Sequence, residues 1–186
     1  MKEKILDAAE LLVQSRGLNA VTFQDIADAV NLRKPSLFHH VKNKEELVLL
    51  LIERCCSKHG PSYAAIVSQD SPAPQKLIEI AKLFEMGLKE SRPCLLAAIG
   101  SARESLSKEA SKQLQAAAEQ AVSRIASVFS QGRKEGTLIF QGKPKHAAIG
   151  FFGMLQGLQT LCKVNDDLPA FSHASSVYIR SLTAQQ

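Results

Sequence analysis

The stretch TFQDIADAVNLRKPSLFHHVKNK, residues 22–44, determines the fold that we expect for this chain. Thr22, followed three residues later by Asp25, has the spacing of a capping box, which marks the start of a helix. Asn31 tolerates the left-handed backbone of a tight turn, and Pro35 suits the first turn of a second helix. The pattern predicts a helix-turn-helix, whose second helix enters the major groove of DNA.

The charges in this stretch also point to DNA. From Arg33 to Lys44 there are four fixed positive charges and two histidines but no acidic residue. Such a run gains binding free energy on a polyanion by releasing counterions. The net charge of +5 is not concentrated here, because residues 1–59 hold 9 Lys and Arg against 8 Asp and Glu. The alternative is a solvated basic turn on an ordinary helical protein.

The chain from about residue 3 to residue 50 resembles the DNA-binding domain of the tetracycline-repressor (TetR) family. The likeness is nearly continuous over ILDAAELLVQSRGLNAVTFQDIADAVNLRKPSLFHHVKNKEEL. Members usually carry a Leu-Tyr-x-His-Phe run and then a Lys, and the run here extends from Leu37 to Val41 and is followed by Lys44. The resemblance implies an N-terminal DNA-binding domain and a C-terminal helical domain for ligand binding and dimerisation.

Three positions depart from the family pattern. Phe38 replaces a Tyr whose hydroxyl commonly reaches a phosphate, Val41 replaces a core Phe, and Pro35 stands where Gly or Ala is common. Phe38 therefore cannot make the hydroxyl contact, and the packing around Val41 should differ slightly.

Eight residues are candidates for contacting DNA. Side chains at the start of the second helix should face base edges, and Arg is the best suited of them to pair with guanine. Residues at helix ends are better placed for phosphate, by position and by the resemblance. The base-reading candidates are Arg33, Lys34, Ser36 and His39; the phosphate candidates are Thr22, His40 and Lys44; Phe38 completes the set. For each of them the alternative is plain surface solvation.

Helical periodicity and turn residues organise the rest of the chain, which we expect to be all-α. Gly17 should end a first helix, and Asn43 with Glu46 should open another. We expect the Gly60-Pro61 pair to break that helix. The only β-like run, residues 137–140, is short.

Two domains are predicted from this organisation. Residues 1–46 should form the DNA-binding domain, with a connecting helix to about residue 59. Residues 60–186 should form the regulatory and dimerisation domain. In that second domain Gly150, Gly153 and Gly157 fall on nearly one helix face, where small residues allow close helix packing. The resemblance implies that this region leads into a dimer interface, and the alternative is packing within one chain.

The resemblance also implies that a small-molecule inducer, whose identity the sequence does not reveal, binds between helices of residues 75–165. The candidate lining is mostly apolar: Phe84, Leu88, Cys94, Phe129, Met154 and Leu158. An apolar stripe of this kind is more often simple core. Cys94 follows Pro93 at an expected helix start beside Arg92, which favours thiolate and hence reactivity; the alternative is a buried small hydrophobe.

Several other classes of protein are disfavoured. A thiol enzyme would need a base beside Cys94, and we find no such setting, no Gly-rich phosphate loop and no paired metal ligands. No cofactor or metal is therefore expected. The longest apolar run, Leu47 to Ile52, is too short to span a bilayer, and the charged N-terminus does not read as a signal peptide. Cysteines without redox or zinc spacing suit a reducing cytoplasm.

The sequence thus predicts a homodimeric transcriptional regulator, foremost a repressor, that binds a palindromic double-stranded DNA operator. A small-molecule inducer or thiol modification would release it. Two alternatives stay open: an accessory regulator of the same fold that binds a protein, and a thiol-dependent helical enzyme.

Overall fold

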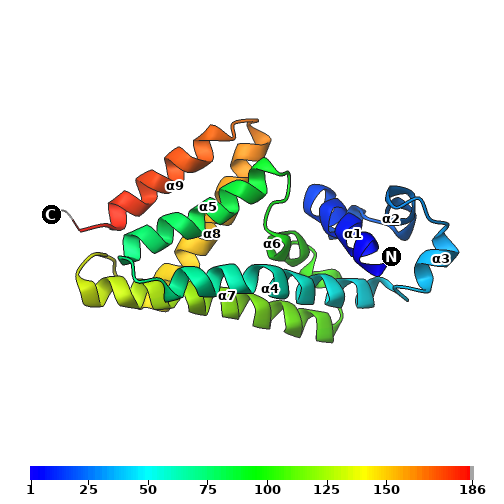
Figure 1. Ribbon diagram of the computed structural model, residues 1–186, viewed down its shortest axis with the longest axis horizontal. Helices are drawn as coiled ribbons and strands as arrows, with labels where there is room; N and C mark the ends of the chain where they lie inside the picture. The colour runs from blue at the N-terminus through cyan, green and yellow to red at the C-terminus, as the bar shows by residue number, and fades with distance from the viewer. Residues whose placement is uncertain (185–186) are drawn as a thin grey trace. The chain divides into compact units, whose positions relative to one another are not determined.

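The computed structural model describes residues 1–184, and this part of the chain is all-α (Figure 1). It contains nine α-helices and no β-strand. The helices are α1 (Lys2–Arg16), α2 (Phe23–Ala29), α3 (Lys34–Phe38), α4 (Lys44–Ser68), α5 (Ala73–Lys89), α6 (Leu95–Gly100), α7 (Lys108–Glu135), α8 (Pro144–Val164) and α9 (Pro169–Leu182). Single 3₁₀ turns at Leu18–Ala20 and Arg103–Ser105 follow α1 and α6. The predicted fold class is confirmed.

Two compact units make up the chain. The first comprises Met1–Lys58 and Ser91–Ala118, and the second comprises His59–Glu90 and Glu119–Gln186. Each unit is built from two separate stretches of the chain. The chain passes between the units within α4 and within α7, so these two helices contribute to both. The functional division at about residue 46 stays a prediction.

In the first unit, α1 contacts both α2 and α6, and α2 contacts α3 (Figure 1). Apolar residues from each of these helices and from α4 form one buried cluster, in which Ile5, Ile26, Leu37, Leu51 and Ile99 are completely inaccessible. Burying an aliphatic side chain of this size contributes about 1.5–3 kcal/mol. This shared core therefore holds the short helices α2 and α3, which are too short to be stable alone.

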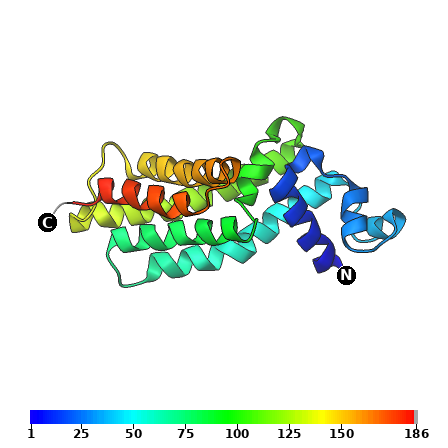
Figure 2. The ribbon, with the colours of Figure 1, turned by 90° about the horizontal axis from the view of Figure 1, so that it is seen from above.

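The second unit is a helical bundle in which α5, α8 and α9 contact one another (Figure 2). Aromatic rings fill its core: Phe129 packs edge-on against Phe140 at 5.1 Å and against Phe151 at 6.0 Å. Gly132 of α7 lies so close to Leu138 that a Cβ there would come within 2.5 Å of its side chain. Leu138 forms only an isolated bridge with Thr183, so residues 137–140 do not make a strand.

The expected break at Gly60-Pro61 is wrong, because α4 is continuous through Pro61. The carbonyl that loses its hydrogen bond belongs to Ser57, and both Ser57 and Pro61 are exposed, so water can replace the missing N–H. Beyond the proline, buried Tyr63 and Ile66 anchor the helix. Tertiary packing thus outweighs the local cost of proline.

Candidate nucleic-acid interface

The start of α2 is set by a capping box. The backbone N–H of Asp25 donates to the Thr22 hydroxyl at 3.2 Å, and the backbone N–H of Thr22 donates to the Asp25 carboxylate at 2.8 Å. The Thr22 hydroxyl hydrogen bond comes first among the causes that hold the pKa of Asp25 below its usual range, and the Arg16 guanidinium adds to it. The predicted cap is confirmed. The Thr22 hydroxyl, which is a candidate for contacting phosphate, is therefore already hydrogen-bonded to Asp25.

The turn between α2 and α3 has the predicted geometry. Asn31 has a positive φ of 55°, and the N–H of Leu32 donates to the carbonyl of Ala27 at 2.9 Å. Leu37 is completely buried, so it anchors the inner side of α3 to the core. The other side chains of this short helix are left to face solvent.

The structure leaves seven of the eight candidate DNA contacts exposed and half-buries His40. Arg33 is the N-cap residue of α3 but its side chain makes no capping bond. The exposed α3 residues are Lys34, Ser36 and Phe38, with His39 as the C-cap. Exposure of this kind is necessary for base reading, but the DNA-contacting role of each residue stays a prediction.

Phe38 has an aromatic partner that no sequence pattern indicated. Its ring stacks on Phe23 of α2 at a centroid distance of 5.0 Å and an interplanar angle of 22°, while 39% of Phe38 stays exposed. The stack fixes an apolar surface beside the polar side chains of α3. The only signal in the sequence was a second Phe at the start of α2.

The entry into α4 follows the prediction as well. Asn43 accepts a hydrogen bond from the backbone N–H of Glu46 at 2.9 Å, and Glu46 accepts one from the N–H of Lys42 at 2.6 Å. Lys44 is exposed in the first turn, where the helix N-terminus attracts anions. This geometry suits phosphate.

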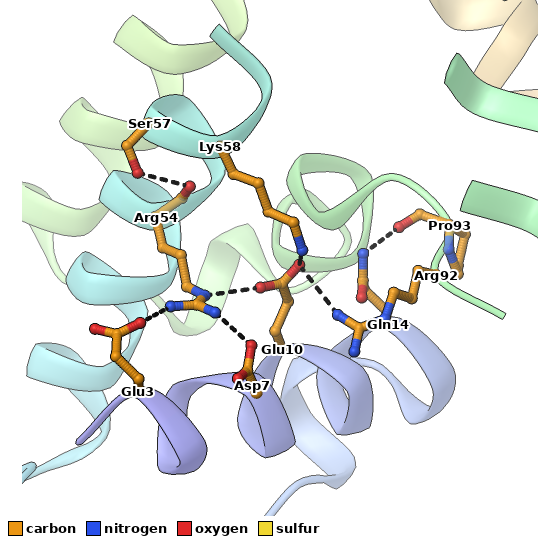
Figure 3. A network of polar contacts seen from close by, with 9 residues as sticks. All are labelled: Glu3, Asp7, Glu10, Gln14, Arg54, Ser57, Lys58, Arg92 and Pro93. Carbon is orange, nitrogen blue, oxygen red and sulfur yellow. Dashed lines mark hydrogen bonds and ion pairs between the residues drawn. The ribbon is translucent and has the colours of Figure 1, made fainter. Parts of the chain in front are cut away.

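In the first unit, a polar network centred on Glu10 ties α1 to α4 (Figure 3). The Glu10 carboxylate is 2% exposed and accepts from Nε of Arg54 at 3.1 Å. Nζ of Lys58 lies 3.6 Å and a guanidinium nitrogen of Arg92 lies 3.8 Å from its other oxygen. Arg54 also pairs with the carboxylates of Glu3 and Asp7.

The same helix face holds the segment that leads into α6. Gln14 donates through Nε2 to the carbonyl of Pro93 at 2.7 Å. Its own Oε1 is buried without a hydrogen-bond partner. Together Glu10 and Gln14 therefore hold residues 92–93 against α1 (Figure 3).

The six candidate ligand contacts do not gather in one unit. Cys94 belongs to the first unit, and the other five belong to the second. Phe84 packs edge-on against Phe152 at 5.8 Å, and Phe129 is completely buried. Leu88 is buried, whereas Met154 and Leu158 are half-buried. A shallow hollow on α7, lined by Ser127, Ser130, Gln131, Lys134 and Glu135, involves none of them. The inducer contacts stay a prediction.

No helix among the described residues is both long and apolar enough to cross a membrane. Within residues 1–184 no cluster of three or more His, Cys, Asp or Glu is arranged to hold a metal ion.

The arrangement of α2 and α3 is that of a helix-turn-helix. Residues 5–51 match the family described as bacterial regulatory proteins, tetR family. The N-terminal part of the chain therefore matches the DNA-binding domain of this family.

Two comparisons illustrate how far the likeness extends. The biofilm operon icaADBC HTH-type negative transcriptional regulator IcaR of Staphylococcus epidermidis is 42% identical over 55 residues, which are 30% of each chain. The chain thus matches only about a third of that relative. A TetR-family transcriptional regulator from Agrobacterium tumefaciens has the same fold, with a TM-score of 0.91 over 98% of this chain and 97% of the other at 21% identity.

A third comparison is with a ligand complex. The transcriptional regulator FadR of Bacillus subtilis, solved in complex with stearoyl-CoA, has a TM-score of 0.75 at 17% identity, over 96% of this chain and 97% of that one.

Proposed function

We propose that the protein is a DNA-binding transcriptional regulator, foremost a repressor, that reads an operator through α3. The observation that carries this proposal is the acid-free run from Arg33 to Lys44, whose four fixed cations are exposed on a helix-turn-helix with a buried apolar core. Phosphate contacts by its cations would supply affinity, and Arg33 would supply base discrimination. The IcaR relative, a negative regulator, supports the sign of regulation.

We propose further that it acts as a homodimer on a palindromic site. The glycines Gly150, Gly153 and Gly157 of α8 are exposed, and a Cβ at Gly153 or Gly157 would meet no atom within 4 Å. Packing within the chain therefore does not account for Gly153 and Gly157. Exposed apolar residues flank this face: Ile149, Leu161 and Val164 on α8, and Val177 on α9. A two-fold dimer would present two α3 helices to two half-sites.

Release by a small molecule in the second unit also belongs to this proposal. The FadR complex with stearoyl-CoA shows that a chain of this fold can hold a small molecule. Thiol modification is the other route of release, and the thiols of the first unit provide it.

The decisive experiment is footprinting of the DNA upstream of the protein's own gene and its neighbours, at two salt concentrations. We expect a protected near-palindrome that weakens as salt rises. Arg33→Ala should cost about 1–3 kcal/mol of binding free energy and relax specificity at one position. Lys82→Ala, which removes an exposed charge from α5, is the matched control. Absence of protection by a well-folded dimer at either salt concentration would refute DNA binding and favour a protein partner.

A further inference from the structure

Two cysteine-bearing segments of the first unit share one anchor. Cys55 lies on α4 between Arg54 and Lys58, and both of these side chains pair with Glu10. Cys94 comes two residues after Arg92, which approaches the same carboxylate (Figure 3). A cationic side chain close in sequence to each cysteine thus reaches the same carboxylate on α1.

The apolar surroundings bring the two segments together as well. Cys55 is buried in the same core cluster as Leu95 and Ile99, the α6 residues that follow Cys94. Burial raises the pKa of the Cys55 thiol, and the nearby Cys94 raises it further. An electrostatic effect of this kind acts between close neighbours. Cys94 itself is half-buried, so it keeps access to solvent.

We propose that Cys55 and Cys94 form a redox-active pair that a peroxide-class oxidant converts into a disulfide between α4 and the start of α6. The more accessible Cys94 reacts first: its thiolate attacks one peroxide oxygen, the O–O bond breaks, and a sulfenic acid forms while hydroxide leaves. The Cys55 sulfur then attacks the Cys94 sulfur. Its proton leaves with the sulfenic hydroxyl as water.

The two reaction steps are balanced in atoms and electrons. Two thiols and one hydrogen peroxide give one disulfide and two waters; each sulfur gives up one electron, and the peroxide takes up two. The bond requires a Cα–Cα separation of about 4.4–6.8 Å. The disulfide would fix Cys94 to α4 beside the cations that surround Glu10.

The regulatory consequence rests on the proposed DNA-binding function. Glu10 and Gln14 belong to α1, and α1 contacts α2 of the helix-turn-helix. We therefore expect the disulfide to weaken operator binding by about 5- to 150-fold, the usual range for coupling between sites.

The test uses the full chain, treated with hydrogen peroxide, alkylated and digested with trypsin. Trypsin releases Cys55 and Cys56 in residues 55–58 and Cys94 in residues 90–103, since the Arg92-Pro93 bond resists cleavage. We expect these two peptides joined by a disulfide in the wild type, in Cys56→Ser and in Cys162→Ser. The link should vanish in Cys55→Ala and Cys94→Ala, and thiol reductant should reverse it.

Three results would overturn the proposal. One is oxidation of Cys94 to sulfinic acid with no joined peptides, and a second is a link that persists in Cys55→Ala through Cys56. The third is alkylation of Cys94 in the reduced protein no faster than that of buried Cys162, the control thiol in the second unit. Circular dichroism of Cys94→Ala and Cys55→Ala confirms that each variant is folded.

Operator binding is measured separately on the reduced and the joined protein. Weaker binding by the joined form supports the regulatory role, and equal binding overturns it. If the reduced protein binds no operator while the disulfide still forms, the proposed function fails and the thiol pair stands. The two failures are therefore distinguishable.

Discussion

The ring of Phe38 lies stacked on the ring of Phe23, so α2 supports an exposed aromatic surface on α3. The stack connects the two helices of the helix-turn-helix outside the buried core. The stack also orients the edge of the Phe38 ring to which a tyrosine at this position would add its hydroxyl.

Phe38→Tyr should tighten operator binding. The added hydroxyl extends from a ring that the stack on Phe23 already orients, and a hydrogen bond to a charged phosphate contributes about 1.5–3 kcal/mol, or roughly 10- to 150-fold in affinity. Titration of labelled operator with the wild type and the variant measures the change. Phe38→Leu is the control that keeps an apolar side chain but removes the ring. An unchanged dissociation constant for Phe38→Tyr would show that position 38 does not approach the backbone of the DNA.

The capping box should make stability depend on acid. The pKa of Asp25 is held low in the folded chain, chiefly by its hydrogen bond with Thr22. A depressed folded-state pKa stabilises the protein above the ordinary value of 3.8, and this contribution is lost as pH falls through the folded-state value. Denaturant melts from pH 7 to pH 3 should show a smaller acid loss in Asp25→Asn than in the wild type. An identical acid loss would contradict this account.

Glu10→Gln should destabilise the first unit strongly. It leaves three cations around a neutral amide, and we expect a loss of about 2 kcal/mol, less than for a fully enclosed pair because the cations are partly exposed. Glu3→Gln is the matched control: Glu3 also pairs with Arg54, but its side chain is 76% exposed, so its loss should change stability by less than about 0.5 kcal/mol. Chemical denaturation compares the two variants. Equal losses would mean that burial at Glu10 does not strengthen the pair.

Gly153→Ala separates the two explanations of the exposed glycines. In an isolated chain the substitution should stabilise α8 by roughly 1 kcal/mol, because alanine favours helix and the added Cβ meets no neighbour. In a dimer with closely packed α8 helices it should weaken association instead. Sedimentation equilibrium and thermal melting at several protein concentrations measure both effects. Higher melting temperature with unchanged association would exclude a glycine-mediated interface.

The structural features that could be predicted from the sequence were the local ones. The cap at Thr22, the cap at Asn43 and the turn at Asn31 all depend on residues within four positions of one another, and the structure confirms each. The continuity of α4 through Pro61 could not be predicted, because it depends on tertiary packing of the following turns.

Contacts between distant residues were likewise invisible in the sequence. Glu10 meets Arg92 across the chain, and Phe23 meets Phe38 across a turn; neither pair has a characteristic spacing. For seven of the eight candidate DNA contacts the motif predicted side chains that the structure leaves exposed. The capping box predicted from the sequence is the interaction that engages the Thr22 hydroxyl with Asp25.

The crowding at Gly132 has a use in genetics. Any side chain there would collide with Leu138 and with Ala73, whose Cβ would be 2.8 Å away, and overpacking of this kind costs about 1–3 kcal/mol. The helix-turn-helix lies in the other unit. Gly132→Ala should therefore behave as a temperature-sensitive allele, whose product functions when cells grow cool and is lost when they are warmed. Shifting such a strain between temperatures and following transcript levels would reveal which genes respond first, with no knowledge of the inducer.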